Sequence, residues 1–292
     1  MAELAIRRAE KLVRDEGLTT LPIDPKALAA AHGIEVTAKP ADAKGVSGML
    51  ISVPGTNNFV IAYATHISNE GFQRFSIAHE LGHYFLDGHL DHLLGTSDIH
   101  HSRAGFGSGD KYELQADHFA AGLLMPTQLF VPVMERAGLG FQAIETLRTE
   151  CVASITATAI RYAQLCEEPV AVIVSSGSRI DYWFASDTFK YSGFTWPRKG
   201  DPLSLKTATA EFNKDPQRVA TATKWQQSAT IRDWFGDGPD REIAEDVVGL
   251  VSYGKTLTVL FAEHSWPDEE DEEDEELGAW NPTLGRSRSR VS

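Results

Sequence analysis

A histidine pair inside a predicted helix constrains this chain more than any other feature. Residues 79–83 read HELGH, so His79 and His83 are four positions apart. The surrounding stretch, residues 70–87, repeats apolar side chains at helical spacing. Because positions i and i+4 of a helix share one face, the two imidazoles can bind one metal ion. The sequence therefore predicts a helix that carries two metal ligands.

Glu80, which follows the first histidine, is the candidate catalytic residue. Zinc in a catalytic site keeps an open position for water and lowers the pKa of that water toward about 7. A neighbouring carboxylate can take the proton and pass it to a leaving amine. The alternative is a helix with two exposed histidines, since so short a motif also occurs by chance. Gly82 costs about 1 kcal/mol relative to alanine inside a helix, which indicates that backbone or substrate approaches it closely.

A third metal ligand is expected on the next strong helix pattern, residues 111–124. Glu113 and Asp117 lie one turn apart there, on one face. Glu113 is the predicted third ligand. Asp117 is predicted to hydrogen-bond the far nitrogen of His79 or His83, which would fix the tautomer of that ligand. The alternative is a pair of solvated carboxylates on an amphipathic helix.

His89 is the rival for the third ligand position. It follows His79 by ten residues, the spacing of the third histidine in the metzincin pattern HExxHxxGxxH. That pattern requires a glycine where this chain has Leu86. We therefore expect the helix to continue to about Asp87 and His89 to point away from the site. The other candidate histidines rank lower still: His92, His100, His101 and His118.

The hydrophobic pattern of the whole chain predicts an α+β fold. Before the motif it predicts helices at residues 2–16 and 25–32 and strands at 34–38, 46–53 and 58–64. Residues 89–110, rich in His, Gly, Ser and Asp, are predicted as a loop. Three shorter helices are expected after residue 126, at 127–137, 141–149 and 153–166. From residue 168 the pattern is strand-like, most clearly at 170–176, 179–186 and 256–264.

Three stretches of this chain together resemble the ImmA/IrrE-type metallopeptidases. They are FVIAY at 59–63, RFSIAHELGHYFL at 74–86 and YELQADHFAAGLLMP at 112–126. The spacing of HExxH to an E-x-x-A-D-x-F-A-x-x-L-L-M-P helix is far rarer than HExxH alone. The resemblance covers residues 1–126 well and extends more weakly to residue 166. It implies a zincin-like N-terminal fold in which His79, His83 and Glu113 bind zinc and Glu80 is the catalytic acid and base.

The same resemblance implies a zinc-dependent endopeptidase that cleaves a regulatory protein, either a helix-turn-helix repressor or an antitoxin, to relieve repression. Manganese or iron also suits two imidazoles and a carboxylate. The competing interpretation is a non-catalytic regulatory module that binds a partner repressor or DNA and has a structural or vestigial metal site. Glu80 favours the enzyme, because a purely structural site has no use for a general base.

Four segments are predicted along the chain: a metallopeptidase domain at 1–126, a helical segment resembling a helix-turn-helix at 127–167, a C-terminal α+β domain at 168–266 and a flexible tail at 267–292. By family analogy, the C-terminal domain is sensor-like. Residues 150–165 have the pattern of a second helix of a helix-turn-helix, but their only basic residue is Arg161. DNA-reading helices carry several phosphate and base contacts, so we favour a structural or substrate-docking role over DNA binding.

Charge and composition narrow the remaining function classes. Of the net charge of −14, the acidic run Asp268–Glu276 carries nine negative charges, and the rest of the chain is only mildly acidic. Direct nucleic-acid binding is therefore disfavoured. Cys151 and Cys166 are predicted to be buried free thiols. The sequence shows neither a signal-peptide pattern nor an apolar run of about 18 residues, so we expect a cytoplasmic protein with no membrane contact.

Overall fold

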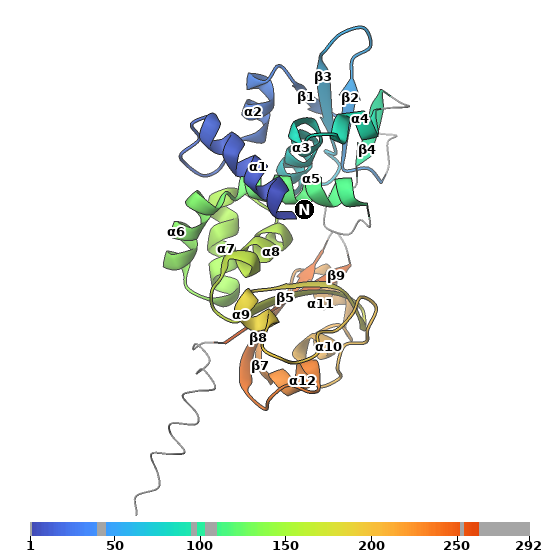
Figure 1. Cartoon of the computed structure of the whole chain (residues 1–292). Helices are drawn as coiled ribbons and strands as arrows, with labels where there is room; N and C mark the ends of the chain where they lie inside the picture. Colours follow the sequence, from blue (N-terminus) through green and yellow to red (C-terminus); the bar gives the residue numbers. More distant parts are fainter. Residues whose placement is uncertain (1, 40–44, 95–97, 103–109, 252–253, 263–292) are drawn as a thin grey trace, which may run out of the picture.

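The computed structural model describes residues 2–39, 45–94, 98–102, 110–251 and 254–262 of the chain. The predicted acidic run and the rest of the tail from residue 267 lie outside these ranges. The fold is mixed α+β, as predicted, with one sheet near each end and a layer of helices between them (Figure 1). None of the described helices combines the length and apolarity that crossing a bilayer requires.

The first sheet supports the HELGH helix. The elements before that helix are α1 (Ala2–Asp15), α2 (Pro25–Ala31), β1 (Glu35–Ala38), β2 (Gly48–Ser52) and β3 (Phe59–Tyr63). With a later strand, β4 (Ile99–Ser102), the strand order is β1-β3-β2-β4. Strands β2 and β3 pair as the predicted hairpin, and β1 is parallel to β3. The five elements before the HELGH helix begin and end within two residues of the predicted ranges. The agreement follows from strong local signals, such as the Asp24 side chain that accepts hydrogen bonds from the first turn of α2.

The HELGH motif lies in the central helix of this half, α3 (Glu70–Phe85), which Asn69 caps at its start. Residues 75–83, which include the motif, are buried on all sides, because the sheet covers one side of the helix and helix α5 (Lys111–Leu124) covers the other. Burial is therefore wider than the apolar spacing alone predicts, since two layers enclose this helix. The helix also ends at Phe85, two residues before the predicted Asp87.

The stretch predicted as a loop, residues 89–110, contains a helix and a strand. Gly88 adopts φ 76° and turns the chain into the short helix α4 (His89–Leu93). Strand β4 (Ile99–Ser102) then pairs antiparallel with β2 at the end of the sheet order. The strand reads IHHS, which has no alternating apolar pattern, so only its pairing with β2 reveals it. The other residues of the stretch are described only in part, because 95–97 and 103–109 lie outside the described ranges.

Helix α5 (Lys111–Leu124) begins where predicted, with the side chain of Asp110 accepting hydrogen bonds from the backbone of Tyr112 and Glu113. It packs against both α1 and α3. A Cβ atom added at Gly82 of α3 would lie 3.1 Å from the Cα atom of Ala116 in α5. The glycine in the HELGH motif thus allows the backbone of a second helix to approach, rather than a substrate.

Three helices follow and form the middle layer: α6 (Thr127–Ala137), α7 (Gly140–Cys151) and α8 (Ile155–Leu165). They agree with the predicted ranges to within two residues. The segment 150–165 differs from a single helix, because Val152 adopts φ 48° and residues 152–154 form the turn between α7 and α8. Most of α8 is buried, and it packs on two strands of the second sheet, β5 (Val170–Ser176) and β6 (Arg179–Ala185). Its basic residue, Arg161, is 2% exposed.

The second sheet has the strand order β6-β5-β9-β8-β7 and is antiparallel throughout. Its strands are β5 (Val170–Ser176), β6 (Arg179–Ala185), β7 (Lys224–Thr230), β8 (Glu242–Leu250) and β9 (Lys255–Phe261). Four short helices accompany it: α9 (Asp187–Lys190), α10 (Ala208–Phe212), α11 (Pro216–Ala220) and α12 (Ile231–Phe235). The sequence pattern predicted β5, β6 and β9 but missed β7, β8 and the helices. Strand β7 reads KWQQSAT and is largely exposed, so it carries little hydrophobic signal.

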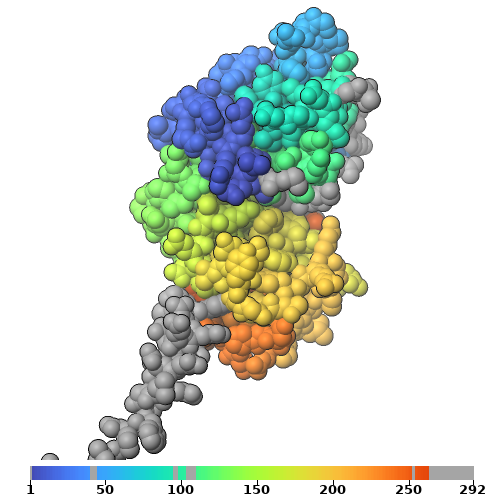
Figure 2. Space-filling model, viewed as in Figure 1, coloured from blue at the N-terminus to red at the C-terminus, as the bar shows by residue number. Residues whose placement is uncertain are grey.

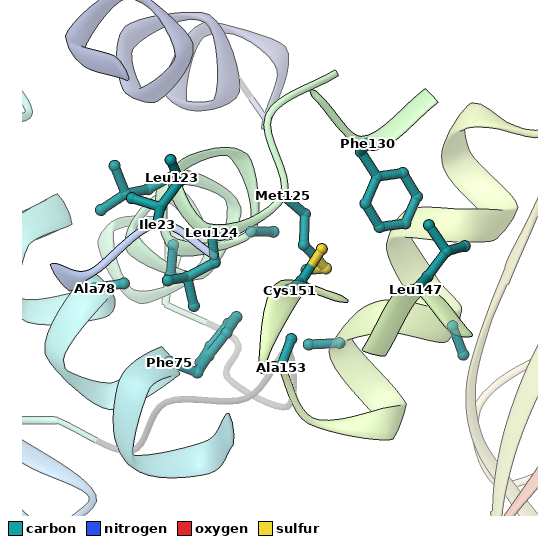
Figure 3. Packing of buried hydrophobic residues seen from close by; sticks show 14 of the residues in the cluster. Ile23, Phe75, Ala78, Leu123, Leu124, Met125, Phe130, Leu147, Cys151 and Ala153 are labelled. Atoms are coloured by element: carbon teal, nitrogen blue, oxygen red, sulfur yellow. The ribbon is translucent and has the colours of Figure 1, made fainter. Parts of the chain in front are cut away.

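One hydrophobic cluster extends from the first half into the second sheet. It includes Phe75 and Leu81 of α3, Leu147 of α7 and Val172 and Val259 of the second sheet. Figure 3 shows part of it, where residues of α3 and α5 meet residues of the middle helices, among them Phe75, Leu124, Phe130, Leu147 and Cys151. The other face of the second sheet has a separate cluster around Phe189 and Phe235. Packing is thus continuous at residues 126 and 168, and the segment boundaries predicted there stay predictions.

The space-filling view shows the same continuity on the surface, where the green middle helices lie directly between the blue-to-teal first half and the yellow-to-orange second sheet (Figure 2). Both cysteines are free thiols. Cys151 is buried, as predicted, and Cys166 is half-buried. Burial raises the pKa of the Cys151 thiol to about 12, so it stays protonated at physiological pH.

Candidate metal centre

Three predicted ligands come together between α3 and α5. The Nε2 atoms of His79 and His83 are 3.0 Å apart. Glu113 of α5 places Oε2 3.5 Å from His79 Nε2 and Oε1 3.2 Å from His83 Nε2. Both imidazoles are fully buried, and the Glu113 side chain is 14% exposed. Three ligand atoms from two helices therefore converge on one point.

These three residues fit a metal ion. A tetrahedral zinc ion with bonds of about 2.0–2.2 Å keeps its ligand atoms roughly 3.3–3.6 Å apart, close to the separations seen here. One side-chain atom from each of His79, His83 and Glu113 lies within 4.8 Å of the others, and no second such group of His, Cys, Asp or Glu occurs in the described residues. Two nitrogens and one carboxylate oxygen leave a fourth position for water or substrate, as a catalytic zinc site requires.

Glu80 lies in the same helix and is completely buried. Neither of its carboxylate oxygens has a hydrogen-bond partner among the described residues, and the hydroxyl of Ser102 lies nearby without hydrogen-bond geometry. Gly48 of β2 makes room for it, since a Cβ atom there would lie 2.4 Å from Glu80 Oε1. A buried carboxylate without a partner costs folding free energy, which indicates that Glu80 interacts with what binds at the site.

Residues 29–159 match the family described as the IrrE N-terminal-like domain, peptidase M78. This match supports the predicted resemblance of this part of the chain to the ImmA/IrrE family. A relative, the radiation response metalloprotease IrrE of Deinococcus radiodurans, is 36% identical over 101 residues. That alignment covers 35% of this chain and only 29% of the relative, so the chain spans less than a third of that protein.

A wider likeness concerns the fold alone. A transcriptional regulator of Mycobacterium tuberculosis superposes with a TM-score of 0.55 at 16% sequence identity. The superposition covers 88% of this chain and 75% of the other. The shared architecture therefore extends beyond the ImmA/IrrE-type part, into the second sheet.

Asp117 lies behind the first histidine of the candidate site. Nδ1–H of His79 donates a hydrogen bond of 2.8 Å to Asp117 Oδ1, and Asp117 is 1% exposed. Because Asp117 follows Glu113 by one turn of α5, the helix that offers the third ligand also orients the ring of the first. Such an outer carboxylate fixes the tautomer of a histidine ligand and raises its basicity.

The electrostatics of the three ligands favour a cation between them. Burial by itself would lower the pKa of His79, but Asp117 and Glu113 together raise it to about 10. Burial lowers the pKa of His83 to about 3, so this imidazole is neutral, as a metal ligand must be. Burial would raise the pKa of Glu113, but contacts of its carboxylate with His100, His79 and His83 lower that pKa well below its usual range. A metal ion would take the place of the proton that this arrangement retains at His79.

The position of His89 contradicts the prediction that it points away. It is buried, and its Nδ1 atom lies 3.0 Å from His83 Nδ1. The prediction failed because α3 ends at Phe85 and Gly88 turns the chain back toward the site. His89 contacts the rear nitrogen of His83, however, and so lies behind the ligand rather than beside it.

His100 also reaches the site, although the sequence ranked it low. Its Nε2 atom is 3.0 Å from Glu113 Oε1, and its ring centroid is 4.7 Å from that of His83. It lies on β4, a strand that the sequence pattern did not predict, so no local signal pointed to it. Of the other candidates, His92 is exposed and stacks on Tyr112, His101 is exposed on β4, and His118 is half-buried on α5.

Proposed function

We propose that the chain is a metal-dependent endopeptidase in which His79, His83 and Glu113 bind the metal and Glu80 is the catalytic acid and base. The observation that carries the proposal is the buried carboxylate of Glu80, which has no partner among the described residues and lies on the helix that bears two of the three ligands. A metal site that only stabilised the fold would gain nothing from a buried, unpaired carboxylate.

The roles of the residues follow from their environments. His79 Nε2, His83 Nε2 and Glu113 would hold zinc, with manganese or iron as substitutes. When bound, the metal supplies a Lewis acid that lowers the pKa of water toward about 7. Burial raises the pKa of Glu80 to about 7, while the charge of His79 opposes the rise. A carboxyl group with a pKa near neutrality can both accept a proton and return it to the leaving amine of a peptide bond.

The proposed substrate is a regulatory protein, specifically a helix-turn-helix repressor or an antitoxin whose cleavage relieves repression. The match to the ImmA/IrrE family and the metalloprotease name of the Deinococcus relative support a regulatory peptidase. The transcriptional regulator of similar fold agrees with a regulatory role. The two free thiols agree with a reduced, cytoplasmic location.

We assign a role to three of the four predicted segments. Residues 1–126 carry the metal site, residues 127–167 form a structural or docking layer and residues 168–266 act as a sensor-like α+β domain. The buried position of Arg161 supports the structural role of the middle layer. A helix that packs its side chains against a sheet is not free to enter a DNA groove.

The test measures cleavage of the helix-turn-helix protein encoded by the adjacent gene, with zinc or manganese added. It compares the wild-type protein with the Glu80→Gln variant. We expect wild type to cleave the partner and Glu80→Gln to lose cleavage by orders of magnitude, because the amide cannot accept the proton. Both proteins should contain equal zinc, since Glu80 is not a ligand. If the partner binds to both proteins but neither cleaves it, the non-catalytic binding module is the correct interpretation and the enzyme is excluded.

A further inference from the structure

Two residues from different elements form a hydrogen-bonded chain behind His83. The Nδ1 atom of His83 faces Nδ1 of His89 in α4 at 3.0 Å. The Nε2 atom of His89 in turn faces Oε1 of Gln115 in α5 at 3.1 Å. His89 is 1% exposed, and the edge of its ring meets Tyr112 at a centroid distance of 5.0 Å. The arrangement is therefore built into the interior, and it ends on a neutral side chain.

Only one distribution of hydrogens along this hydrogen-bonded chain permits metal binding at His83. A neutral imidazole has one N–H group, so His83 can offer Nε2 to a metal only if Nδ1 carries the hydrogen. His83 Nδ1–H must then donate to His89 Nδ1, which has to be an unprotonated acceptor. His89 consequently carries its hydrogen on Nε2 and needs an acceptor there, and the amide oxygen of Gln115 occupies that position.

The opposite arrangement would block the site. If the amide nitrogen of Gln115 donated to His89 Nε2, His89 would carry its hydrogen on Nδ1 and donate it to His83 Nδ1. His83 would then be protonated on Nε2, the atom that faces His79 and Glu113. A doubly protonated His89 would block the site in the same way, because its Nδ1–H group would also face His83 Nδ1.

We propose that Gln115 and His89 are positioning residues that hold His83 in its metal-binding tautomer. The inference rests on the proposed metal site and adds to it the way the second histidine is set. The two histidine ligands would then be tuned differently, His79 by the carboxylate of Asp117 and His83 by a neutral relay. A neutral relay adds no charge to a site that already has the carboxylates of Glu80, Glu113 and Asp117.

The test measures the zinc Kd of full-length variants by competition with a chelator. Gln115→Met keeps the length of the side chain but has only a weak acceptor, and we expect it to weaken zinc binding about tenfold. Gln115→Glu keeps the acceptor and should bind zinc at least as tightly as wild type. His92→Gln is the matched control: it replaces an exposed histidine of the same short helix and should change the Kd less than about twofold.

Several outcomes would overturn the relay. If Gln115→Met binds zinc with the wild-type Kd, Gln115 is not part of the relay. If Gln115→Met and Gln115→Glu weaken zinc binding equally, the role of Gln115 is packing instead. Nitrogen NMR of the zinc-loaded wild type tests the tautomers without any variant: His89 should carry hydrogen only on Nε2, and hydrogen on Nδ1 would refute the proposal. Failure of wild type to bind zinc would instead refute the proposed function, on which the relay depends.

Discussion

At the residue scale, each proposed ligand has its own partner from the surrounding structure. His79 meets Asp117, His83 meets His89, and Glu113 meets His100. The partners come from α5, α4 and β4, so three elements hold the ligands of a site built on two helices. Partners of this kind restrict the ligand side chains to one orientation before a metal arrives, which reduces the entropy lost on binding.

Asp117→Asn tests the best-defined of these contacts. The amide oxygen can still accept from His79 Nδ1–H, but the negative charge that favours a cation at His79 is lost. We expect zinc affinity to fall about tenfold or more, measured by chelator competition. Asp110→Asn is a charge-matched control at the N-cap of the same helix, where the side chain caps the first turn, and it should leave the Kd unchanged. Equal effects of the two substitutions would reduce the role of Asp117 to general electrostatics.

At the scale of elements, the geometry of the site is the geometry of the contact between α3 and α5. Helix α3 brings His79, Glu80 and His83, and α5 brings Glu113 and Asp117. Gly82 sets how closely these helices approach, because a side chain there would meet Ala116 and Phe119. Helix α5 approaches α1 in the same way at Gly122, where a Cβ atom would lie 3.0 Å from Ile6 Cα.

Gly82→Val is therefore expected to lower both stability and metal affinity. The inserted side chain would separate α3 from α5 and cost about 1–3 kcal/mol of unfolding free energy by overpacking. The same separation would move Glu113 away from the two histidines, so the zinc Kd should rise about tenfold. Gly122→Val is the control, since it overpacks the other side of α5. It should lose similar stability in urea unfolding but keep zinc affinity, and loss of affinity in both variants would contradict this account.

At the scale of the whole molecule, one ion pair joins the first half to the middle layer. The Arg161 guanidinium on α8 donates to Glu10 of α1 at 2.9 Å and to the hydroxyl of Thr127 at 2.9 Å. Its Nε atom donates to the carbonyl oxygen of Met125 at 3.0 Å. Three segments distant in the sequence thus meet at one buried cation, beside the hydrophobic cluster that continues into the second sheet.

Glu10→Ala should destabilise the protein strongly, because it leaves the buried charge of Arg161 without its counter-ion. The expected loss is about 3–5 kcal/mol in urea unfolding. The double variant Glu10→Ala with Arg161→Met removes the charge as well and should recover part of this loss. An exposed pair such as Arg7 and Glu3 of α1 is the control, and Glu3→Ala should cost less than about 1 kcal/mol. A double variant no more stable than Glu10→Ala would show that packing around Arg161, not its charge, is what matters.

The sequence by itself determined the parts of this protein that depend on local geometry. Spacing along a helix put His79 and His83 on one face, and Glu113 and Asp117 on another, because a helix repeats every 3.6 residues. The helices from α1 to α8, apart from the short α4, were therefore predictable to within about two residues. The side chains of Asp24, Asn69 and Asp110 cap the starts of α2, α3 and α5, since each accepts hydrogen bonds from the first turn of its own helix.

Tertiary structure alone decided which distant residues surround the ligands. His100 reaches Glu113 because β4 pairs with β2, and His89 reaches His83 because the chain turns at Gly88. Neither contact can be predicted from a local sequence pattern. Strand β4 is short and polar, and the direction of the chain after a glycine depends on what the chain packs against. The exposed strand β7 and the continuous core across residues 126 and 168 could not be predicted from the sequence for the same reason. Strand pairing and helix packing join residues far apart in the chain, and only the folded molecule brings them together.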